Sequence, residues 1–345
     1  MMSRRIAVVG AGAIGAVHAR LIQSLPQATL GAIVDDDESR ASALAEQYGV
    51  PWFTSAEQAY LEAKIDLASV CTPSALHADV AITAMRCGLD VIIEKPIDIT
   101  VEAADRIREV ELDSGRTVSV ISQRRFQPAA SFIRTAIDRG LLGRMTSGIV
   151  ESAFFRSQEY YDSGGWRGTL AIDGGGALMN QGIHALDLLL WMLGEPVSVS
   201  ARTGRLAHER IDVEDVAGAT IEFESGAIGM LLASTAAYPG RPVRLAVHGD
   251  AGTAVMENDE LDYFSSAHTE DPPALPSTTA DAPEGWSQVD VAHRDQYADV
   301  LEAIENGRAP AVTTHDARRA LRVVLAVYES ARTGMPVDLR EQVTQ

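Results

Sequence analysis

Short apolar runs alternate with helix-periodic segments along the first third of the chain. Strands are predicted at residues 5–9, 28–34, 67–71, 90–94 and 117–121, with a short extended piece at 51–53. Helices are predicted between them, where apolar residues recur at helical spacing, at residues 16–25, 39–48, 55–61, 77–87 and 100–114. This alternation is typical of a parallel, doubly wound α/β sheet, in which ligands bind at the carboxyl ends of the strands.

The pattern changes after residue 122, where the segment Gln123–Pro128 ends the alternation. Glu224–Gly226 indicates a hairpin turn, and several strands follow one another without helices between them. A helix is predicted at 129–139, and strands are predicted at 145–155, 197–206, 217–223, 227–234, 243–249 and 253–256. We therefore predict an open, mostly antiparallel sheet with helices on one face.

Two domains are predicted, because 345 residues exceed what one ordinary core accommodates. The first is a dinucleotide-binding domain over residues 1–122, and the second is an α/β domain over residues 123–345. Residues 265–288, rich in Pro, Ser, Thr and Asp, are predicted to form a mobile surface loop. Helices around 297–304 and 316–333 follow, and these terminal helices can pack back on the first domain.

The formal net charge of −19 argues against nucleic acid and anionic membranes as partners, because both require basic surfaces. The first strand leaves no room for a secretory signal, and the apolar run at 185–193 is too short to span a bilayer. We therefore predict a cytoplasmic protein. Cys71 and Cys87 offer no metal or disulfide pattern. No metal site is predicted, and six histidines without a matching ligand set are interpreted as structural or surface residues: His18, His208, His248, His268, His293 and His315.

A glycine motif follows the first strand and opens the first helix. Gly10, Gly12 and Gly15 have G-x-G-x-x-G spacing, and Ala13 and Ile14 lie between the last two. In this context the first glycine makes a tight turn, the second lets a pyrophosphate approach the backbone, and the third allows close packing of helix on strand. The helix N-terminus then faces the phosphates. The motif predicts dinucleotide binding.

Asp35 ends the second strand, twenty residues beyond Gly15, where an acid can accept hydrogen bonds from ribose hydroxyls. Asp36 and Asp37 would repel a 2′-phosphate, so NAD is favoured and NADP is the less favoured cofactor. Arg40 is an argument for NADP, because an arginine near the ribose can bind the 2′-phosphate. As an alternative, Asp36, Asp37 and Arg40 form only a solvated turn and the start of a helix.

Two further strand ends line the predicted cofactor crevice: Thr72-Pro73, with His77 in the helix that follows, and Glu94-Lys95. Lys95 is singled out because only one other lysine, Lys64, occurs among 29 basic residues. An ammonium group can lose a proton or act as a compact donor when partly desolvated, whereas a guanidinium effectively cannot be deprotonated. A surface ion pair with Glu94 is the alternative.

The segment Asp173–Asp187 is a glycine run that leads into an apolar helix. At about 100° per residue, Asn180 and His184 lie on one face, with Asp187 close by. Glycines at the helix mouth let another group approach the backbone and leave amide donors free to point at it. Cofactor and substrate are the groups for which we expect this clearance. A buried amphipathic helix without a ligand is the alternative.

A polar, aromatic and glycine-rich loop at residues 156–169 precedes this helix. Such a loop suits a carbohydrate, whose hydroxyls need polar partners and whose C–H faces stack on aromatic rings. Tyr161, Trp166 and Arg167 are candidate substrate-binding residues, and Arg124 in the crossover between the domains is a further candidate. Alternatively, Trp166 covers the edge of a core and Arg167 forms an interdomain ion pair.

Taken in order, these motifs resemble those of the Gfo/Idh/MocA family of oxidoreductases. The resemblance covers essentially the whole chain and rests on the glycine motif, Thr72–His77, Glu94–Pro96 and Gly174-Gly175-Gly176-x-x-x-Asn180-x-Gly182-x-His184-x-x-Asp187. It implies a Rossmann domain and a second domain that binds substrate and forms homodimers or homotetramers through its sheet. It also implies that Lys95 orients the reacting hydroxyl and that His184 handles its proton.

The activity that the resemblance implies is NAD-dependent oxidation of a sugar, sugar derivative or cyclitol. A histidine with an ordinary pKa of ~6.5 suits a general acid and base near neutral pH. Two alternatives remain: an NADPH-dependent ketosugar reductase, and a sugar sensor without catalysis. One departure is Asn180, where many polyol-oxidising members carry aspartate. An amide cannot take up a proton, although it can hydrogen-bond a substrate hydroxyl or hold Lys95 and His184 in place.

Overall fold

The computed structural model describes residues 3–269, 272–276 and 283–340. The chain divides into two compact units. Unit 1 comprises residues 1–123 and 290–318, and unit 2 comprises residues 124–289 and 319–345. The predicted domains at 1–122 and 123–345 stay a prediction, because these units are defined by compactness and not by independent folding.

Unit 1 contains a parallel sheet of six strands, counted over the described residues, in the order β3-β2-β1-β4-β5-β6. This is the order of doubly wound dinucleotide-binding folds, so the predicted α/β class is confirmed. The strands are β1 (Arg4–Val9), β2 (Ala28–Val34), β3 (Trp52–Phe53), β4 (Leu67–Val70), β5 (Asp90–Ile93) and β6 (Val118–Val120).

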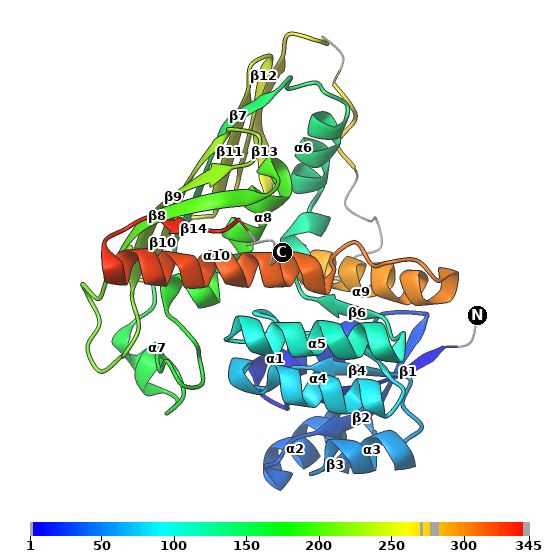
Figure 1. Ribbon diagram of the computed structural model, residues 1–345. Coiled ribbons are helices and arrows are strands. Elements are labelled where there is room, and N and C mark those ends of the chain that lie inside the picture. Colours follow the sequence, from blue (N-terminus) through cyan, green and yellow to red (C-terminus); the bar gives the residue numbers. More distant parts are fainter. Residues whose placement is uncertain (1–2, 270–271, 277–282, 341–345) are drawn as a thin grey trace. The chain divides into compact units, whose positions relative to one another are not determined.

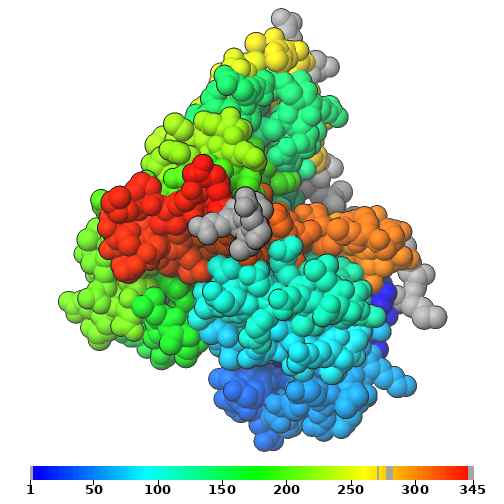
Figure 2. All heavy atoms as spheres, viewed as in Figure 1, coloured from blue at the N-terminus to red at the C-terminus, as the bar shows by residue number. Residues whose placement is uncertain are grey.

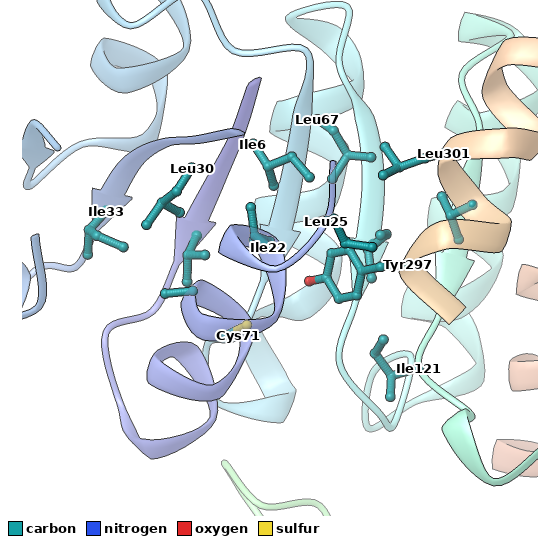
Figure 3. Close-up of a cluster of buried hydrophobic side chains, with 14 of the residues drawn as sticks. Ile6, Ile22, Leu25, Leu30, Ile33, Leu67, Cys71, Ile121, Tyr297 and Leu301 are labelled. Atoms are coloured by element: carbon teal, nitrogen blue, oxygen red, sulfur yellow. The ribbon is translucent and has the colours of Figure 1, made fainter. Parts of the chain in front are cut away.

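Helices pack on this sheet in two groups. One core layer joins the strands to α1, α2 and α9, and its buried side chains include Ile22, Leu67 and Tyr297 (Figure 3). In Figures 1 and 2, α4 and α5 lie side by side and form a continuous outer surface. The helical segments are α1 (Ala13–Gln23), α2 (Glu38–Tyr48), α3 (Ala56–Glu62), η1 (Ser74–Leu76), α4 (His77–Arg86), α5 (Val101–Ser114), η2 (Gln123–Phe126) and α9 (Gln288–Asn306).

Unit 2 contains a sheet of eight strands within the described residues, in the order β13-β12-β11-β7-β10-β9-β8-β14. The pairs are antiparallel except β7 with β10, which run parallel, so the predicted open and mostly antiparallel sheet is confirmed. The strands are β7 (Met145–Ala153), β8 (Pro196–Gly204), β9 (Val216–Phe223), β10 (Ile228–Ser234), β11 (Arg244–Gly249), β12 (Gly252–Glu257), β13 (Glu260–Ser266) and β14 (Val337–Asp338).

In unit 2, α6 and α8 pack against this sheet (Figure 1): α6 contacts β12 and β13, and α8 contacts β7, β10 and β11. α8 is apolar almost throughout because most of its residues are buried there. The helical segments are α6 (Pro128–Asp138), α7 (Gln158–Asp162), the π-helix η3 (Leu178–Gly182), α8 (Ile183–Leu193) and α10 (Thr314–Thr333), of which residues 319–333 belong to this unit. No helix in the described ranges is long and apolar enough to cross a membrane.

Several local predictions are confirmed, and others need correction. Thr100 caps α5 by accepting a hydrogen bond from the Ala103 amide at 3.2 Å, and Gly226 turns the β9–β10 hairpin with φ of +83°. The edge strand β13 was not predicted, since its mixed polar and apolar residues lack a clean alternation. It takes up the first two positions of the predicted loop at 265–288, of which residues 270–271 and 277–282 lie outside the described residues.

Candidate active site

The glycine motif in unit 1 serves two separate purposes. Gly10 has φ of +104°, and a Cβ there would lie 2.5 Å from the Cys71 carbonyl oxygen, while a Cβ on Gly15 would lie 1.8 Å from the Gly10 oxygen. These two glycines are therefore required by the chain itself. A Cβ on Gly12 would meet nothing within 4 Å. This open space over the backbone is what a pyrophosphate needs for close approach, so the loop fits a dinucleotide.

Asp35 links the glycine loop to the end of β2. Its Oδ2 accepts a hydrogen bond from the Ala11 amide at 2.7 Å, and its Oδ1 accepts one from the Asp37 amide at 2.9 Å. Burial alone would raise the pKa of Asp35, but hydrogen bonds from Arg40 and these two amides hold the pKa below its ordinary value. The carboxylate is therefore ionised and can accept bonds from ribose hydroxyls.

Arg40 lies among three carboxylates. Its Nη2 lies 2.7 Å from Asp35 Oδ1 and 3.2 Å from Asp36 Oδ1, and its Nη1 lies 3.5 Å from Asp37 Oδ2. A 2′-phosphate would have to compete with these acids for the one guanidinium. The arrangement therefore favours a ribose with a free 2′-hydroxyl.

His77 joins two of the predicted crevice segments. Its Nδ1 lies 2.7 Å from the Pro96 carbonyl oxygen, and its Nε2 lies 2.9 Å from the Thr72 carbonyl oxygen. The side chain is 1% exposed, so it holds the two segments together and is not placed to touch a ligand directly. The Thr72 hydroxyl is buried and has no hydrogen-bond partner, which suits a residue that awaits a polar ligand.

Glu94 supports the backbone of Lys95 from inside unit 1. Its Oε2 accepts a hydrogen bond from the Lys95 amide at 3.0 Å, and its Oε1 lies 3.0 Å from His18 Nε2 and 3.5 Å from His293 Nε2. Burial alone would raise the pKa of Glu94, yet the two imidazoles hold the pKa well below its ordinary value. The carboxylate that fixes the Lys95 backbone is therefore ionised.

The interpretation of His18 and His293 as structural or surface residues agrees with their burial, but the statement that they lack a matching ligand set needs correction. His18, Glu94 and His293 offer three possible ligand atoms within 4.8 Å of one another. α1, the end of β5 and α9 supply one residue each, so only the fold brings them together.

The hydrogen-bond directions in this cluster can be assigned from its chemistry. Burial lowers the pKa of His18, so its ring is neutral. Because the Glu94 carboxylate only accepts, His18 Nε2 must carry the proton and Nδ1 must accept. Nδ1 then accepts from the Tyr297 hydroxyl at 2.7 Å or the Ser69 hydroxyl at 2.9 Å, and these two hydroxyls lie 2.6 Å from each other. The chain of hydrogen bonds thus ends at the Glu94 carboxylate, which also accepts from the Lys95 amide.

The glycine run in unit 2 is occupied by the chain itself, so the expectation of free amide donors there is corrected. Glu214 Oε2 accepts a hydrogen bond from the Gly176 amide at 2.9 Å, and Oε1 accepts one from the Leu178 amide at 2.8 Å. A Cβ on Gly176 would lie 1.8 Å from the backbone carbonyl oxygen of Glu214, and one on Gly175 would lie 2.3 Å from the Tyr328 hydroxyl. Two glycines of the run, Gly175 and Gly176, therefore give clearance to Tyr328 and Glu214.

His184 lies at the start of α8, directly after the π-helix η3. This π-turn was not predicted, because the apolar spacing of the segment also fits an α-helix. Such turns are rare and often occur at functional sites. Asn180, inside it, donates from Nδ2 to the Gly175 carbonyl at 3.1 Å. Asp187, one turn after His184, is bound by Arg125 through two hydrogen bonds of 2.7 Å and 2.6 Å.

In the predicted substrate loop, one candidate aromatic side chain is buried and another is exposed. Tyr161 is 7% exposed, and its hydroxyl lies 2.8 Å from the Thr235 hydroxyl, so it belongs to a small core with Ile211 and Val213. Trp166 is 37% exposed, and the Arg167 guanidinium lies over its ring at 4.7 Å. The sequence pattern indicated Tyr161 as a substrate-binding candidate but not its neighbour Tyr160. The same Arg167 guanidinium also lies over the Tyr160 ring, 4.4 Å from its centroid.

Arg124 forms an ion pair with Asp259, and both side chains are 14% exposed. A role of Arg124 in substrate binding would require this ion pair to open. The structure thus groups Lys95 with the cofactor candidates in unit 1, and Asn180, His184 and the aromatic loop in unit 2.

Comparisons with known proteins agree with this architecture. Residues 4–122 match the model of an oxidoreductase family with an NAD-binding Rossmann fold, and residues 131–255 match a Gfo/Idh/MocA C-terminal domain. A scyllo-inositol 2-dehydrogenase (NAD(+)) from Bacillus subtilis (strain 168) is 29% identical over 344 residues, covering 97% of this chain and 96% of its own. An inositol 2-dehydrogenase from Rhizobium meliloti (strain 1021) is 30% identical over 346 residues, covering 95% and 97%.

Among solved structures, the WlbA dehydrogenase from Bordetella pertussis in complex with NADH and UDP-GlcNAcA superposes with a TM-score of 0.87. It is 28% identical to this chain, and the match covers 99% of both chains. The two family models and these full-length similarities lead to one assignment. The chain belongs to the Gfo/Idh/MocA family of NAD-binding oxidoreductases.

Proposed function

We propose that this protein is an NAD-dependent dehydrogenase that oxidises a hydroxyl-bearing carbon of a sugar, sugar derivative or cyclitol. The observation that carries the proposal is the placement of Lys95. One of only two lysines in the chain follows β5 of a dinucleotide-binding sheet, and a buried, ionised carboxylate holds its backbone. Names of relatives add support, since two of them act on inositol.

In this mechanism the bound nicotinamide accepts a hydride from the substrate carbon. Lys95 donates a hydrogen bond to the reacting hydroxyl and orients it, and His184 accepts the hydroxyl proton. In the reverse direction His184 returns the proton to the carbonyl oxygen. Asn180 cannot carry a proton, so its amide is assigned to substrate binding or to holding its neighbours in place.

NAD is the proposed cofactor in preference to NADP. The support is the environment of Arg40, whose guanidinium lies within ion-pair distance of three carboxylates. The site of action that we propose is the cytoplasm.

The test is an absorbance assay for NADH with a panel of inositols, hexoses, glycosides and UDP-sugars. We expect turnover of at least one member with NAD and much weaker turnover with NADP. Lys95→Ala and His184→Ala should each lower kcat/KM by about 10²–10⁴-fold, as expected for loss of acid–base or orienting groups. Lys64→Ala and His268→Ala are the matched controls and should retain activity.

Three outcomes would contradict the proposal. NADPH oxidation by a ketosugar, with no alcohol turned over, would identify a reductase. Sugar binding without any turnover would identify a sensor. Full activity of both Lys95→Ala and His184→Ala would show that the assigned residues are wrong.

We also propose that the protein forms a homodimer or homotetramer through the open face of its eight-stranded sheet. On β10, Ile228, Met230 and Leu232 alternate with buried residues and are 49%, 45% and 38% exposed. An apolar row of this kind on a sheet face is typical of an interface. Met230→Glu should shift the mass measured by light scattering toward the monomer. Leu112→Glu, at a residue 78% exposed on α5, is the control and should not. An oligomer unaffected by Met230→Glu would place the interface elsewhere.

A further inference from the structure

We propose that Arg156 and Arg167 form a subsite for an anionic group of the substrate, a carboxylate or a phosphate. The inference rests on the proposed function, because it names the substrate class of that site. Both guanidinium groups lie over one ring: Arg167 Cζ is 4.4 Å and Arg156 Cζ is 5.0 Å from the centroid of Tyr160. Arg167 also lies 4.7 Å from the Trp166 ring, and Arg156 lies 5.9 Å from the Phe154 ring.

The positive charge of this pair is not balanced by the protein. Within the described part of the chain, neither guanidinium forms an ion pair with a carboxylate or donates a hydrogen bond. Two acids near this loop have other partners, since Asp162 pairs with Arg210 at 2.7 Å and Asp215 accepts from His208. In a chain with net charge −19, two adjacent cations without a counter-charge are unusual.

Arg156 also has an unsatisfied hydrogen-bond donor. Its Nε is buried and has no hydrogen-bond partner. A buried N–H that is left unbonded is unfavourable, so such a group calls for an explanation. An anion bound beside Tyr160 would supply both the missing acceptor and the missing negative charge.

The subsite is built on the strand end that also supports the His184 helix. The Arg156 amide donates to the Thr235 carbonyl at 2.8 Å, just after β10 ends at Ser234. On the same strand, Ala233 packs against Gly182, since a Cβ on Gly182 would lie 2.7 Å from it. Gly182 is two residues from His184, so the arginine pair and the proposed base are anchored to neighbouring positions within unit 2.

The geometry selects the ligand chemistry. A guanidinium stacked on an aromatic ring keeps its N–H edge free, and that planar edge matches the two oxygens of a carboxylate or phosphate. Neutral polyols offer no charge to such a pair. The substrate class is therefore a sugar or cyclitol that carries an acid group, as a uronate, a sugar phosphate or a nucleotide-linked sugar does.

The experiment measures ligand binding to the full-length protein, independently of turnover. Calorimetry with glucuronate against glucose, and with glucose 6-phosphate against glucose, separates the carboxylate from the phosphate source. We expect at least one anionic member to bind about tenfold or more tightly than its neutral partner, in the range of a charge-assisted hydrogen bond. Arg156→Gln and Arg167→Gln should abolish this preference, while Arg139→Gln, at an exposed arginine elsewhere in unit 2, should preserve it.

Arg167→Lys keeps the charge but loses the planar fork, and it should retain only part of the preference. Circular dichroism shows whether each variant is folded. Equal affinity for anionic and neutral sugars in the unmodified protein, or a preference that survives both glutamine variants, would overturn the subsite. Anion binding without NADH formation would refute the proposed dehydrogenase activity but support the subsite. Turnover of neutral sugars without any preference for anions would support the dehydrogenase activity but refute the subsite.

Discussion

Two buried glutamates, one in each unit, support the two proposed catalytic residues, and their pKa values are shifted in opposite directions. Glu94 is 6% exposed and fixes the Lys95 backbone, and Glu214 is 8% exposed and fixes the glycine run before His184. The pKa of Glu94 lies well below its ordinary value, whereas burial raises the pKa of Glu214 above its ordinary value.

The difference follows from the partners of each carboxylate. Glu94 faces the imidazoles of His18 and His293, and hydrogen bonding and electrostatic attraction to these two rings lower its pKa. Glu214 accepts hydrogen bonds from two backbone amides and, at 3.1 Å, from the Tyr328 hydroxyl, all of which are neutral. Neutral dipoles lower the pKa of Glu214, but not enough to outweigh desolvation. Burial alone therefore does not decide the charge of a supporting carboxylate.

The largest effect is expected for Glu94→Gln. An amide group must place its NH₂ against either the Lys95 amide or His18 Nε2, both of which donate in the assigned chain. We expect a loss of about 1–3 kcal/mol in the free energy of unfolding, from the unsatisfied donor. We also expect kcat to fall by up to about 100-fold as Lys95 is displaced.

Urea unfolding and steady-state kinetics would check this expectation, with Glu109→Gln on the exposed face of α5 as the control. A variant with unchanged kcat would show that Glu94 does not position Lys95. Stoichiometric metal in the purified protein, lost in Glu94→Gln, would instead identify His18, Glu94 and His293 as a metal site.

The sequence was sufficient to predict the sheet of unit 1, because its strands are short apolar runs and its helices carry capping signals such as Thr100. The partners of Glu94 could not be predicted in the same way. His18 is 76 positions away, and His293 lies in a helix that joins unit 1 after residues 124–289 of unit 2. Contacts of this kind leave no periodic signal.

The support of the His184 helix was missed for a related reason. The glycines at 174–176 indicated a close approach, but the sequence did not show that Glu214 and Tyr328 are the approaching groups. The π-helix at Leu178–Gly182 was missed because it changes the hydrogen-bond pattern without changing the apolar pattern. The motifs thus indicated the candidate site, and the fold shows which residues support it.

A smaller effect is expected for Glu214→Gln. An amide oxygen at the Oε1 position can keep the bonds from the Leu178 amide and the Tyr328 hydroxyl, so only the bond from the Gly176 amide is lost. The variant also removes a charge whose burial is unfavourable. We expect a change of about 1 kcal/mol or less in the free energy of unfolding at neutral pH, measured by urea titration.

The pH dependence of these two variants gives the sharpest test of the comparison. The folded pKa of Glu94 is depressed, so its contribution to stability is present above the unfolded pKa of ~4.3 and is lost as the pH falls toward the folded value. The folded pKa of Glu214 is raised, so its contribution is present below ~4.3 and is lost as the pH rises through the folded value. The free energies of unfolding of the unmodified protein and of each variant are measured from about pH 3 to about pH 7. Subtracting the value for the variant from the value for the unmodified protein at each pH gives one difference curve for each variant. The curve for Glu94→Gln should rise with pH and the curve for Glu214→Gln should fall; curves with the same slope would mean that the imidazoles do not set the charge of Glu94.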